Sequence, residues 1–239
     1  MLSSAAGVRA GVSTRSGGVS AEPLGLNLSF RVGDIRERVI ENRKLFFEEL
    51  PVDPRSVAFP LQCHSTIVKS IDAPGEYPEC DALITSRTGL ALAITIADCV
   101  PILLFDQGHH VTAAVHAGWR GSAGRILEKT LALMSDEYDV NPLDILAFIG
   151  PSAHSCCYDV GQEVAEQFPA AFRTPGTDGK SFMALPEYNK QQLVDCGVPP
   201  GAVEIHPHCT ICNNNYHSFR RDGDASGRML AVIAMHSQS

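Results

Sequence analysis

Hydrophobic residues are densest between residues 90 and 106, in the stretch LALAITIADCVPILLFD, yet Asp98 and Cys99 stand side by side at its centre. The apolar residues on either side of this pair, 90–97 and 102–105, predict two strands. Further strands are predicted for residues 57–71 (with a break near the histidine), 111–116, 145–150 and 202–206. An acid inside a buried strand is costly unless it has partners, so the pair marks a candidate site.

Helical spacing of apolar residues begins after Asp34, which we expect to be the N-cap, and ends before Pro51. Further helices are predicted for residues 121–138, 160–168, 185–197 and 228–236. Strands and helices mix without strict alternation, and the chain has no repeat of fixed period. We therefore expect one α+β domain over residues 1–239, with helices packed on mixed sheets.

Residues 106–109, with the sequence DQGH, predict a tight hairpin turn with Gln107 and Gly108 as its central pair. In the resulting hairpin Cys99 faces His116. Opposed residues project from the same face of a sheet, with Cβ atoms roughly 4.5–5.5 Å apart. That spacing suits two ligands of one zinc ion, so we expect a metal site at the break in the apolar run.

His64, in the stretch LQCHST, is the candidate for a third ligand, because it also lies in a broken strand. Two histidines and one cysteine leave the fourth tetrahedral position open, which is typical of catalytic zinc. Such an ion lowers the pKa of a bound water towards about 7. Asp98 is then either a proton shuttle or the partner that orients a histidine.

Two further cysteine motifs compete for a metal. Cys209 and Cys212 form a CxxC in the stretch HPHCTIC, and nearby histidines bring the number of local ligands to four or more. Cys156 and Cys157 are adjacent, and adjacent residues of a strand point to opposite faces. We therefore interpret this second pair as packing thiols, and a metal at the CxxC stays open.

The net charge of −8 at pH 7 argues against a nucleic-acid partner, which needs clustered lysine and arginine. The longest apolar run is shorter than the roughly 20 residues of a membrane-spanning helix, and Asp98 interrupts it, so we expect no membrane segment. The N-terminal sequence lacks the apolar region of a signal peptide. We therefore expect a cytoplasmic protein whose eight cysteines are reduced.

Six stretches together resemble the YfiH family, whose members are also labelled laccase-domain or multicopper polyphenol oxidase proteins and purine nucleoside phosphorylases. They are STRSGGVS, ECDALIT, TIADCVPILLFD, AAVHAGWRGSAGRI, IGPSAHSCCYDVGQEV and CTICNNNYHSFRRDGDASGRML. The resemblance implies a single-domain layered α/β sandwich, related in fold to the catalytic domains of cytotoxic necrotizing factors. It also implies a zinc site of His64, Cys99 and His116, although Ser65 follows His64 where the family pattern has glycine.

The activity that the resemblance implies is phosphorolysis of adenosine, inosine, guanosine and methylthioadenosine to base and pentose 1-phosphate, together with adenosine deamination. The partners are then a purine nucleoside and phosphate. On chemical grounds, Arg15 and Arg120 are our candidates for the phosphate contacts, and Gln62 is a further candidate substrate contact. Other zinc deaminases use a glutamate as proton shuttle, and Asp98 would have to take that part here.

Three other functions stay open. A copper-dependent polyphenol oxidase is disfavoured, because multicopper sites use many histidines in His-x-His pairs, and only His206 and His208 form such a pair. A cysteine hydrolase or amidase, for example one that edits cell-wall precursors, would use Cys99 as nucleophile and His116 as base. A non-catalytic nucleoside-binding module would bind the same ligands without turnover.

Overall fold

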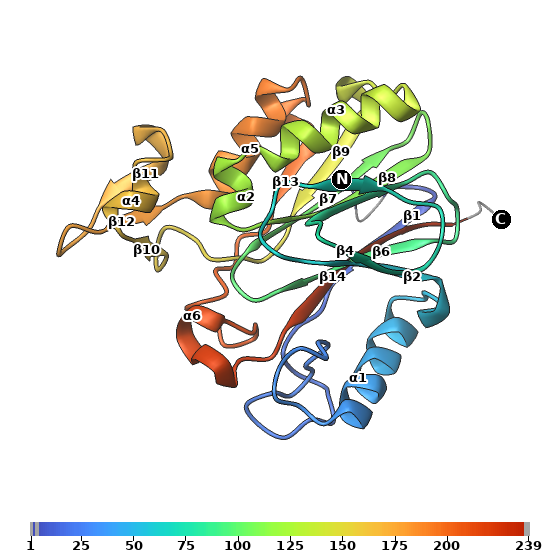
Figure 1. Ribbon diagram of the computed structural model, residues 1–239, viewed down its shortest axis with the longest axis horizontal. Coiled ribbons are helices and arrows are strands. Elements are labelled where there is room, and N and C mark those ends of the chain that lie inside the picture. The colour runs from blue at the N-terminus through green and yellow to red at the C-terminus, as the bar shows by residue number, and fades with distance from the viewer. Residues whose placement is uncertain (1, 3–4, 237–239) are drawn as a thin grey trace.

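Two large mixed β-sheets form the centre of the computed structural model, which describes residue 2 and residues 5–236 (Figure 1). The five-stranded sheet has the order β1 (Val8–Val12), β14 (Met229–Met235), β6 (Ala91–Ile96), β2 (Val57–Leu61) and β4 (Gly75–Pro78). The six-stranded sheet has the order β13 (Val203–Ile205), β9 (Ile145–Ile149), β7 (Val100–Asp106), β8 (Val111–Ala117), β5 (Ala82–Thr85) and β3 (Val68–Ser70). Both sheets contain parallel and antiparallel pairs.

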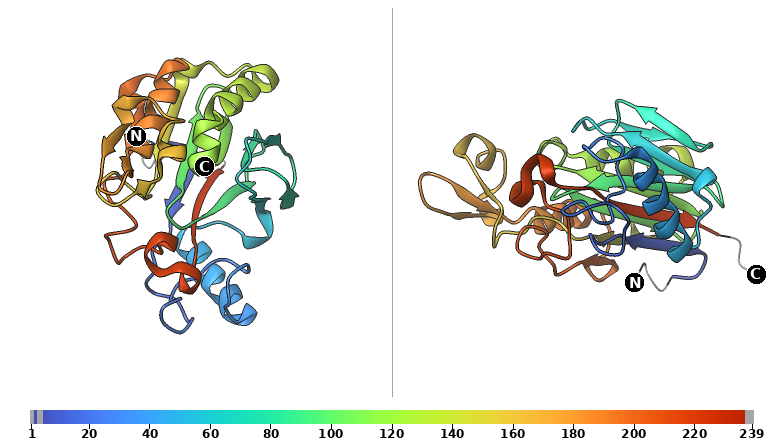
Figure 2. Two further views of the ribbon diagram at one scale, coloured as in Figure 1. Left: turned by 60° about the vertical axis from the view of Figure 1, so that its left-hand side comes forward. Right: turned by 90° about the horizontal axis from the view of Figure 1, so that it is seen from below.

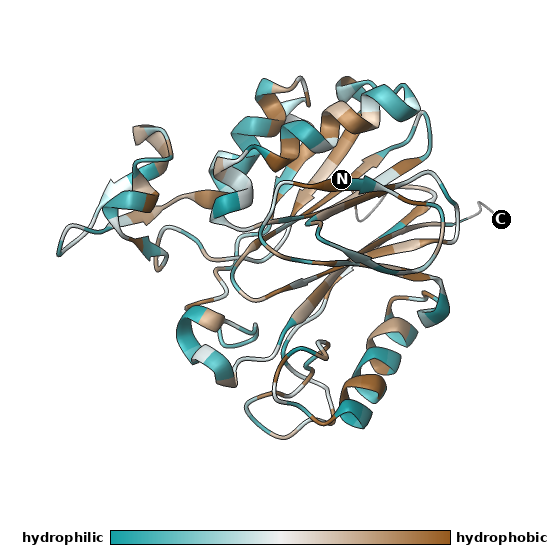
Figure 3. Cartoon of the chain, viewed as in Figure 1, coloured by the Kyte–Doolittle hydropathy of each residue, from teal (hydrophilic) through white to brown (hydrophobic). Residues whose placement is uncertain are grey.

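The two large sheets pack against each other, and the alternation of side chains along their strands explains how. In β7, Leu103 and Phe105 point into the core between the sheets, whereas Ile102 and Leu104 point to the opposite face. Strands β6 and β14 divide their side chains in the same way. Because both faces of these strands are buried, their sequences are almost entirely apolar, and Figure 3 shows brown segments along the central strands.

Helices form the outer layers. The outer face of the six-stranded sheet packs against α2 (Trp119–Ala123), α3 (Ile126–Tyr138) and α5 (Leu185–Asp195). The outer face of the five-stranded sheet packs against α1 (Arg36–Glu49), whose Phe46 and Phe47 contact Val57 and Ala91. The molecule is therefore a four-layer α/β/β/α sandwich, which confirms the predicted layered architecture with mixed sheets.

The smaller elements lie outside this sandwich. A three-stranded sheet of β10 (Asp159–Val160), β12 (Ser181–Met183) and β11 (Arg173–Pro175) projects to one side together with α4 (Gln162–Ala165), as Figures 1 and 2 show. The short helix α6 (Phe219–Asp222) follows a long irregular segment after β13. The two regions contact each other, because the guanidinium of Arg220 in α6 donates to the carbonyl and the carboxylate of Asp159 in β10 at 2.7 and 3.0 Å.

Two predictions concern the chain as a whole. Across the described residues, no helix is long and apolar enough to cross a membrane. The single domain predicted over residues 1–239 also includes residues 1, 3–4 and 237–239, which lie outside the described part of the chain, and it stays a prediction.

The last apolar segment is a strand, so the helix predicted for residues 228–236 is wrong. Strand β14 lies in the middle of the five-stranded sheet and pairs antiparallel with both β1 and β6. All seven of its residues are buried, with Leu230 and Val232 on one face and Ala231 and Ile233 on the other. A run that is apolar at every position has no period, so its pattern does not distinguish a buried helix from a strand buried on both faces.

The hairpin of β7 and β8 forms as predicted, but with another register. Its turn has four residues rather than two, and Pro101 lies opposite His116. The Asp106 carboxylate accepts hydrogen bonds from the backbone N–H and Nδ1 of His109, at 2.7 and 2.8 Å, and these bonds stabilise the longer turn. The predicted direct pairing of Cys99 with His116 is therefore wrong, because Cys99 precedes the strand.

Two helix predictions need smaller corrections. The N-cap of α1 is Ile35, whereas Asp34 accepts a hydrogen bond from the hydroxyl of Ser20. The helix predicted over residues 121–138 is divided into α2 and α3, because Arg125 between them has a left-handed backbone with φ of 61°. The bond between Ser20 and Asp34 and the turn at Arg125 do not change the spacing of apolar residues. The hydrophobic pattern therefore could not predict either feature.

Candidate active site

The chain crosses between the two large sheets twice near the site, and each crossing carries predicted metal ligands. The first crossing joins β2 to β3 and contains His64, and the second joins β6 to β7 and contains Asp98 and Cys99. The apolar run of residues 90–106 therefore belongs to two different sheets, and its polar pair lies in the connection between them. His116 lies near the end of β8 and completes the predicted set of ligands.

Asp98 links the second crossing to two other loops. Its φ of 85° lies in the left-handed region, which turns the chain sharply between the two strands. Its carboxylate accepts hydrogen bonds from the Thr210 hydroxyl and the Arg220 backbone N–H, both at 2.6 Å, and its carbonyl accepts one from the Ala153 N–H at 2.9 Å. Because both carboxylate oxygens are engaged, this geometry favours a residue that positions Cys99 over a proton shuttle.

The three predicted ligands lie together. One ligand atom from each of His64, Cys99 and His116 falls within 4.8 Å of the others, and His64 Nε2 is 3.9 Å from Cys99 Sγ. In a tetrahedral zinc site with bond lengths of about 2.0–2.3 Å, a nitrogen and a sulfur ligand are roughly 3.5 Å apart. The donor set and its spacing therefore fit a metal ion, with one coordination position left for water or substrate.

Asp81, the residue directly before β5, holds this cluster in place, and sequence reasoning did not identify it. Its carboxylate accepts hydrogen bonds from the backbone N–H groups of Cys63, His64 and Ser65 at 3.2, 3.1 and 2.7 Å, and from the Ser65 hydroxyl at 2.9 Å. It also lies 2.8 Å from Nδ1 of His116. A histidine whose Nδ1 is held by a carboxylate presents Nε2 to a metal, which is the usual arrangement around zinc.

The groups of the cluster shift one another's pKa values. Burial raises the pKa of the Cys99 thiol, but the charges and hydrogen bonds of His116 and His64 outweigh burial and lower it to about 6. Burial lowers the pKa of His116, but Cys99 and Asp81 raise it to about 9. Burial also raises the pKa of Asp81, yet bonds with His116 and Ser65 bring it below its usual range. The cluster thus favours a thiolate at Cys99, the form that binds metals and attacks electrophiles.

A pocket of about 350 Å³ opens over the cluster, a volume within the range of about 300–1,000 Å³ that is usual for small-molecule sites. Its lining combines the three candidate ligands with two guanidinium groups and one aromatic ring. The lining residues are Ser29, Arg31, Val32, Gln62, His64, Thr95, Ala97, Cys99, His116, Phe219 and Arg228. The pocket therefore brings together candidate metal ligands, two guanidinium groups and an exposed aromatic ring.

The predicted substrate contacts have different positions. Gln62 lines the pocket, but its amide bonds Thr95 at both ends, donating to the carbonyl oxygen at 2.8 Å and accepting from the backbone N–H at 2.8 Å. Arg15 forms an ion pair with Glu22 and lies outside the pocket lining. Arg120 is exposed on α2, where its guanidinium lies over the ring of the preceding tryptophan at 4.2 Å, and it too lies outside the lining.

The sequence led us to interpret Cys156 and Cys157 as packing thiols that point to opposite faces. The structure contradicts this interpretation, because both thiols belong to one cluster. Their ligand atoms and those of Cys209 and Cys212 all fall within 4.8 Å of one another. Residues 155–157 form a turn and not a strand, so the rule that neighbouring side chains point to opposite faces does not apply. The structure thus contains a second cluster of candidate ligands outside the pocket.

Comparisons with known proteins cover nearly the whole chain. A family model described as multi-copper polyphenol oxidoreductase laccase matches residues 9–236. A relative from Bacteroides thetaiotaomicron, named purine nucleoside phosphorylase, is 36% identical over 98% of this chain and 94% of its own. A protein named adenosine deaminase RL5, from an unknown prokaryotic organism, is 35% identical over 87% of this chain and 86% of its own.

The fold also has a close counterpart among solved structures. The crystal structure of the Bacillus licheniformis hypothetical protein YfiH matches this chain with a TM-score of 0.90 and 32% sequence identity. The match covers 95% of this chain and 92% of that one. The sandwich architecture and the sequence likeness therefore agree over the same length.

Proposed function

This chain belongs to the family described as multi-copper polyphenol oxidoreductase laccase, as its resemblance to YfiH-like proteins predicts, and from that premise we propose that it is a zinc-dependent purine nucleoside phosphorylase that also deaminates adenosine. The names of two relatives support an enzyme that acts on purine nucleosides. The observation that carries the proposal is the convergence of His64, Cys99 and His116 at a pocket that also offers anion and stacking contacts.

We propose zinc as the metal, held by His64, Cys99 and His116. When bound, zinc supplies a Lewis acid and lowers the pKa of water at its open position. Asp81 keeps Nε2 of His116 directed at the metal through its bond to Nδ1. A multicopper oxidase needs an additional histidine-rich copper cluster. Among the described residues, the only group of three or more neighbouring donors that includes histidine is this one.

Phosphate would be bound by Arg31 and Arg228 in place of the Arg15 and Arg120 expected from the sequence. Arg31 and Arg228 both line the pocket. A guanidinium group presents paired N–H donors that match phosphate oxygens. In phosphorolysis a phosphate oxygen forms a bond to C1′ of the pentose, and the bond from C1′ to the base nitrogen breaks. The electron pair of that bond leaves with the base, which then takes up a proton.

The purine ring would stack on Phe219, the first residue of α6. Its side chain is 49% exposed although it is aromatic, and it lines the pocket, with the guanidinium of Arg228 5.4 Å from its ring centroid. Stacking on an aromatic side chain accepts any purine, since each base has the same kind of face. This contact is consistent with activity on several nucleosides.

The decisive experiment incubates purified, metal-quantified protein with inosine and with adenosine, each in the presence and absence of phosphate. Chromatography of the products separates base, nucleoside and pentose phosphate. We expect base release from inosine only with phosphate, deamination of adenosine without it, and neither with Cys99→Ala. Base release that is independent of phosphate, or no turnover of either nucleoside, would contradict the proposal.

A cysteine hydrolase is the second candidate. In that function Cys99 would be the nucleophile, His116 the base, and Asp81 the acid that orients His116. The two functions differ in their need for His64, which a hydrolase of this type does not use. Under the zinc proposal, His64→Ala loses the metal and Cys99 resists alkylation by iodoacetamide until a chelator is added. Rapid alkylation of metal-saturated wild-type protein would favour the hydrolase.

A further inference from the structure

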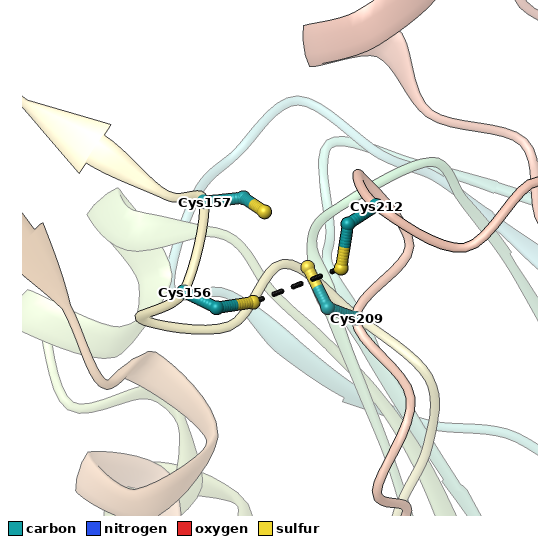
Figure 4. A group of neighbouring side chains, drawn as sticks. All are labelled: Cys156, Cys157, Cys209 and Cys212. Carbon is teal, nitrogen blue, oxygen red and sulfur yellow. Dashed lines mark hydrogen bonds between the residues drawn. The ribbon is translucent and has the colours of Figure 1, made fainter.

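Four cysteines from two loops converge at a point outside the pocket (Figure 4). Cys156 and Cys157 lie between β9 and β10, and Cys209 and Cys212 lie between β13 and α6. Their sulfur atoms all fall within 4.8 Å of one another, and Cys156 Sγ is 3.8 Å from Cys212 Sγ. In a tetrahedral site with zinc–sulfur bonds of about 2.3 Å, two sulfurs are about 3.8 Å apart. The 3.8 Å between Cys156 and Cys212, and the close approach of the other two sulfurs, fit a single ion bound by four thiolates.

The backbone of both loops is arranged around these sulfurs. Ser152 and Cys209 form a parallel β-bridge, and the Thr210 N–H donates to the Ser152 carbonyl at 2.9 Å, which joins the loops directly. The His154 N–H donates to Cys209 Sγ at 3.4 Å, and the Asn213 N–H donates to the Cys209 carbonyl at 3.1 Å. A backbone N–H directed at a sulfur stabilises the thiolate that a metal requires.

We propose that Cys156, Cys157, Cys209 and Cys212 form a second metal site, a closed four-thiolate site that binds one zinc ion and has a structural role. Four sulfur donors with tetrahedral spacing select zinc among the common divalent ions. The site leaves no position open for substrate, in contrast to the three-donor cluster in the pocket. A disulfide would join only two of the four thiols, and the 3.8 Å between Cys156 and Cys212 is far longer than a sulfur–sulfur bond of about 2.05 Å.

The position of this site explains what it would stabilise. The Thr210 hydroxyl, one residue from Cys209, donates to the Asp98 carboxylate, and Ala153 donates to the Asp98 carbonyl. Tyr158, one residue from Cys157, lies under the guanidinium of Arg220 at 5.0 Å. Zinc bound by the four cysteines would fix both loops that hold Asp98, and thereby the crossing that presents Cys99 to the pocket.

Zinc content of single variants tests the proposal. Wild-type protein and each variant are purified, dialysed with a weak chelator and analysed for zinc, iron and copper per chain. We expect two zinc ions in wild type, one in Cys156→Ser and Cys212→Ser, one in Cys99→Ala, and none in the Cys99→Ala/Cys156→Ser double variant. Cys196→Ser, a thiol at the end of α5 away from both clusters, is the matched control and should keep two.

Cobalt(II) provides a readout that does not depend on activity. In Cys99→Ala, where the pocket site is disabled, added cobalt should give intense thiolate-to-metal absorption and the visible bands of a tetrahedral four-sulfur site. The same absorption should be lost in the double variant and kept in Cys99→Ala/Cys196→Ser. Unchanged zinc content in Cys156→Ser, iron or copper in place of zinc, or a Cys156–Cys212 disulfide found by thiol titration of the unfolded protein would overturn the proposal.

Discussion

Gly118 determines how closely the chain after β8 approaches the pocket ligands. A Cβ at this position would lie 3.0 Å from His64 Cδ2 and 3.1 Å from Cys99 Sγ, both closer than ordinary contact. Its backbone, with φ of −67° and ψ of 172°, is accessible to alanine. We therefore expect Gly118→Ala to displace the ligands without unfolding the chain, and to weaken zinc binding in the pocket by roughly 10–100-fold, the usual effect of disturbing the groups around a metal.

Competition with a chromophoric chelator measures this affinity, and the Cys156→Ser background restricts the measurement to the pocket site. Gly201→Ala is the control, since no atom lies within 4 Å of a Cβ built at that glycine. Equal zinc affinity in Gly118→Ala and Gly201→Ala would contradict the argument that the pocket ligands need a residue without a side chain here.

Phe219 should affect substrate binding more than turnover. Removal of an aromatic ring that stacks on a base costs about 1–3 kcal/mol, which corresponds to a rise in KM of roughly 5–150-fold. We expect Phe219→Ala to raise KM for inosine by this factor and Phe219→Tyr to keep it near the wild-type value. Because the side chain is 49% exposed, the thermal stability of both variants should be close to that of wild type. An unchanged KM in Phe219→Ala would exclude stacking at this position.

At the residue scale, the sequence singled out the three candidate metal ligands that the structure brings together, but not the groups that orient them. Cys99 and His64 could be recognised because each interrupts an apolar or alternating run. Asp81 gave a similar signal, an acid directly before the apolar stretch of β5, but its importance comes from bonds to residues 63–65 and to His116, which are distant in sequence. Arg31 gave no local signal, since only the folded chain places it at the pocket.

The helix α3 ends at Tyr138, and its C-cap Asp139 has a left-handed backbone with φ of 54° and ψ of 25°. A left-handed conformation costs a non-glycine residue about 1 kcal/mol, and a carboxylate at the C-terminus of a helix is also unfavourable to the helix dipole. The backbone N–H of Asp139 donates to the carbonyls of Met134 and Ser135, and a substitution that keeps the backbone conformation keeps these bonds. We expect Asp139→Gly to raise the free energy of unfolding by about 1 kcal/mol, as measured by urea denaturation.

Asp136→Gly, one turn earlier in the same helix and equally exposed, is the matched control. Glycine inside a helix costs about 1 kcal/mol, so this variant should be less stable than wild type. If Asp139→Gly were also less stable, the left-handed C-cap would not be the source of strain that the backbone angles indicate.

At the element scale, most strands of the two sheets could be predicted, but not which strands share a sheet. The run of residues 90–106 contains the two predicted strands, but nothing in its pattern showed that they belong to different sheets, with the left-handed backbone of Asp98 in the connection between them. The hairpin register was missed because the Asp106 side chain stabilises a longer turn. Strand β14 was missed because apolar residues on both of its faces remove the alternation that identifies a strand.

At the scale of the whole molecule, the candidate active site depends on both sheets being packed together. His116 belongs to the six-stranded sheet and Asp81 directly precedes its strand β5, whereas His64 and Cys99 lie on the two crossings that join this sheet to the five-stranded sheet. The pocket ligands therefore take their relative positions only when the sandwich is complete. If these ligands hold zinc, as we propose, conditions that loosen the packing between the sheets should release the ion together with the loss of the fold.

His217 makes the stability of the whole molecule depend on pH. Its side chain is fully buried, and burial together with the charges of Arg15, Arg228 and Arg221 lowers its pKa to about 4, with Asp222 opposing them. In the unfolded chain the pKa is about 6.5, so between about pH 4 and 6.5 the unfolded state binds more protons and stability rises with pH. Lowering the pH from 7 to 4 should therefore reduce the free energy of unfolding by up to about 3 kcal/mol through this residue alone.

The comparison of His217→Gln with wild type isolates this contribution, since the other titrating groups are common to both proteins. Urea denaturation at low protein concentration gives the free energy of unfolding at each pH from 4 to 7.5. Glutamine does not titrate, so the difference between wild type and variant should be constant above pH 7 and should move in favour of the variant as the pH falls below 6.5. A difference that stays constant down to pH 4 would mean that His217 is protonated as readily in the folded chain as in the unfolded one, and that its burial has no electrostatic cost.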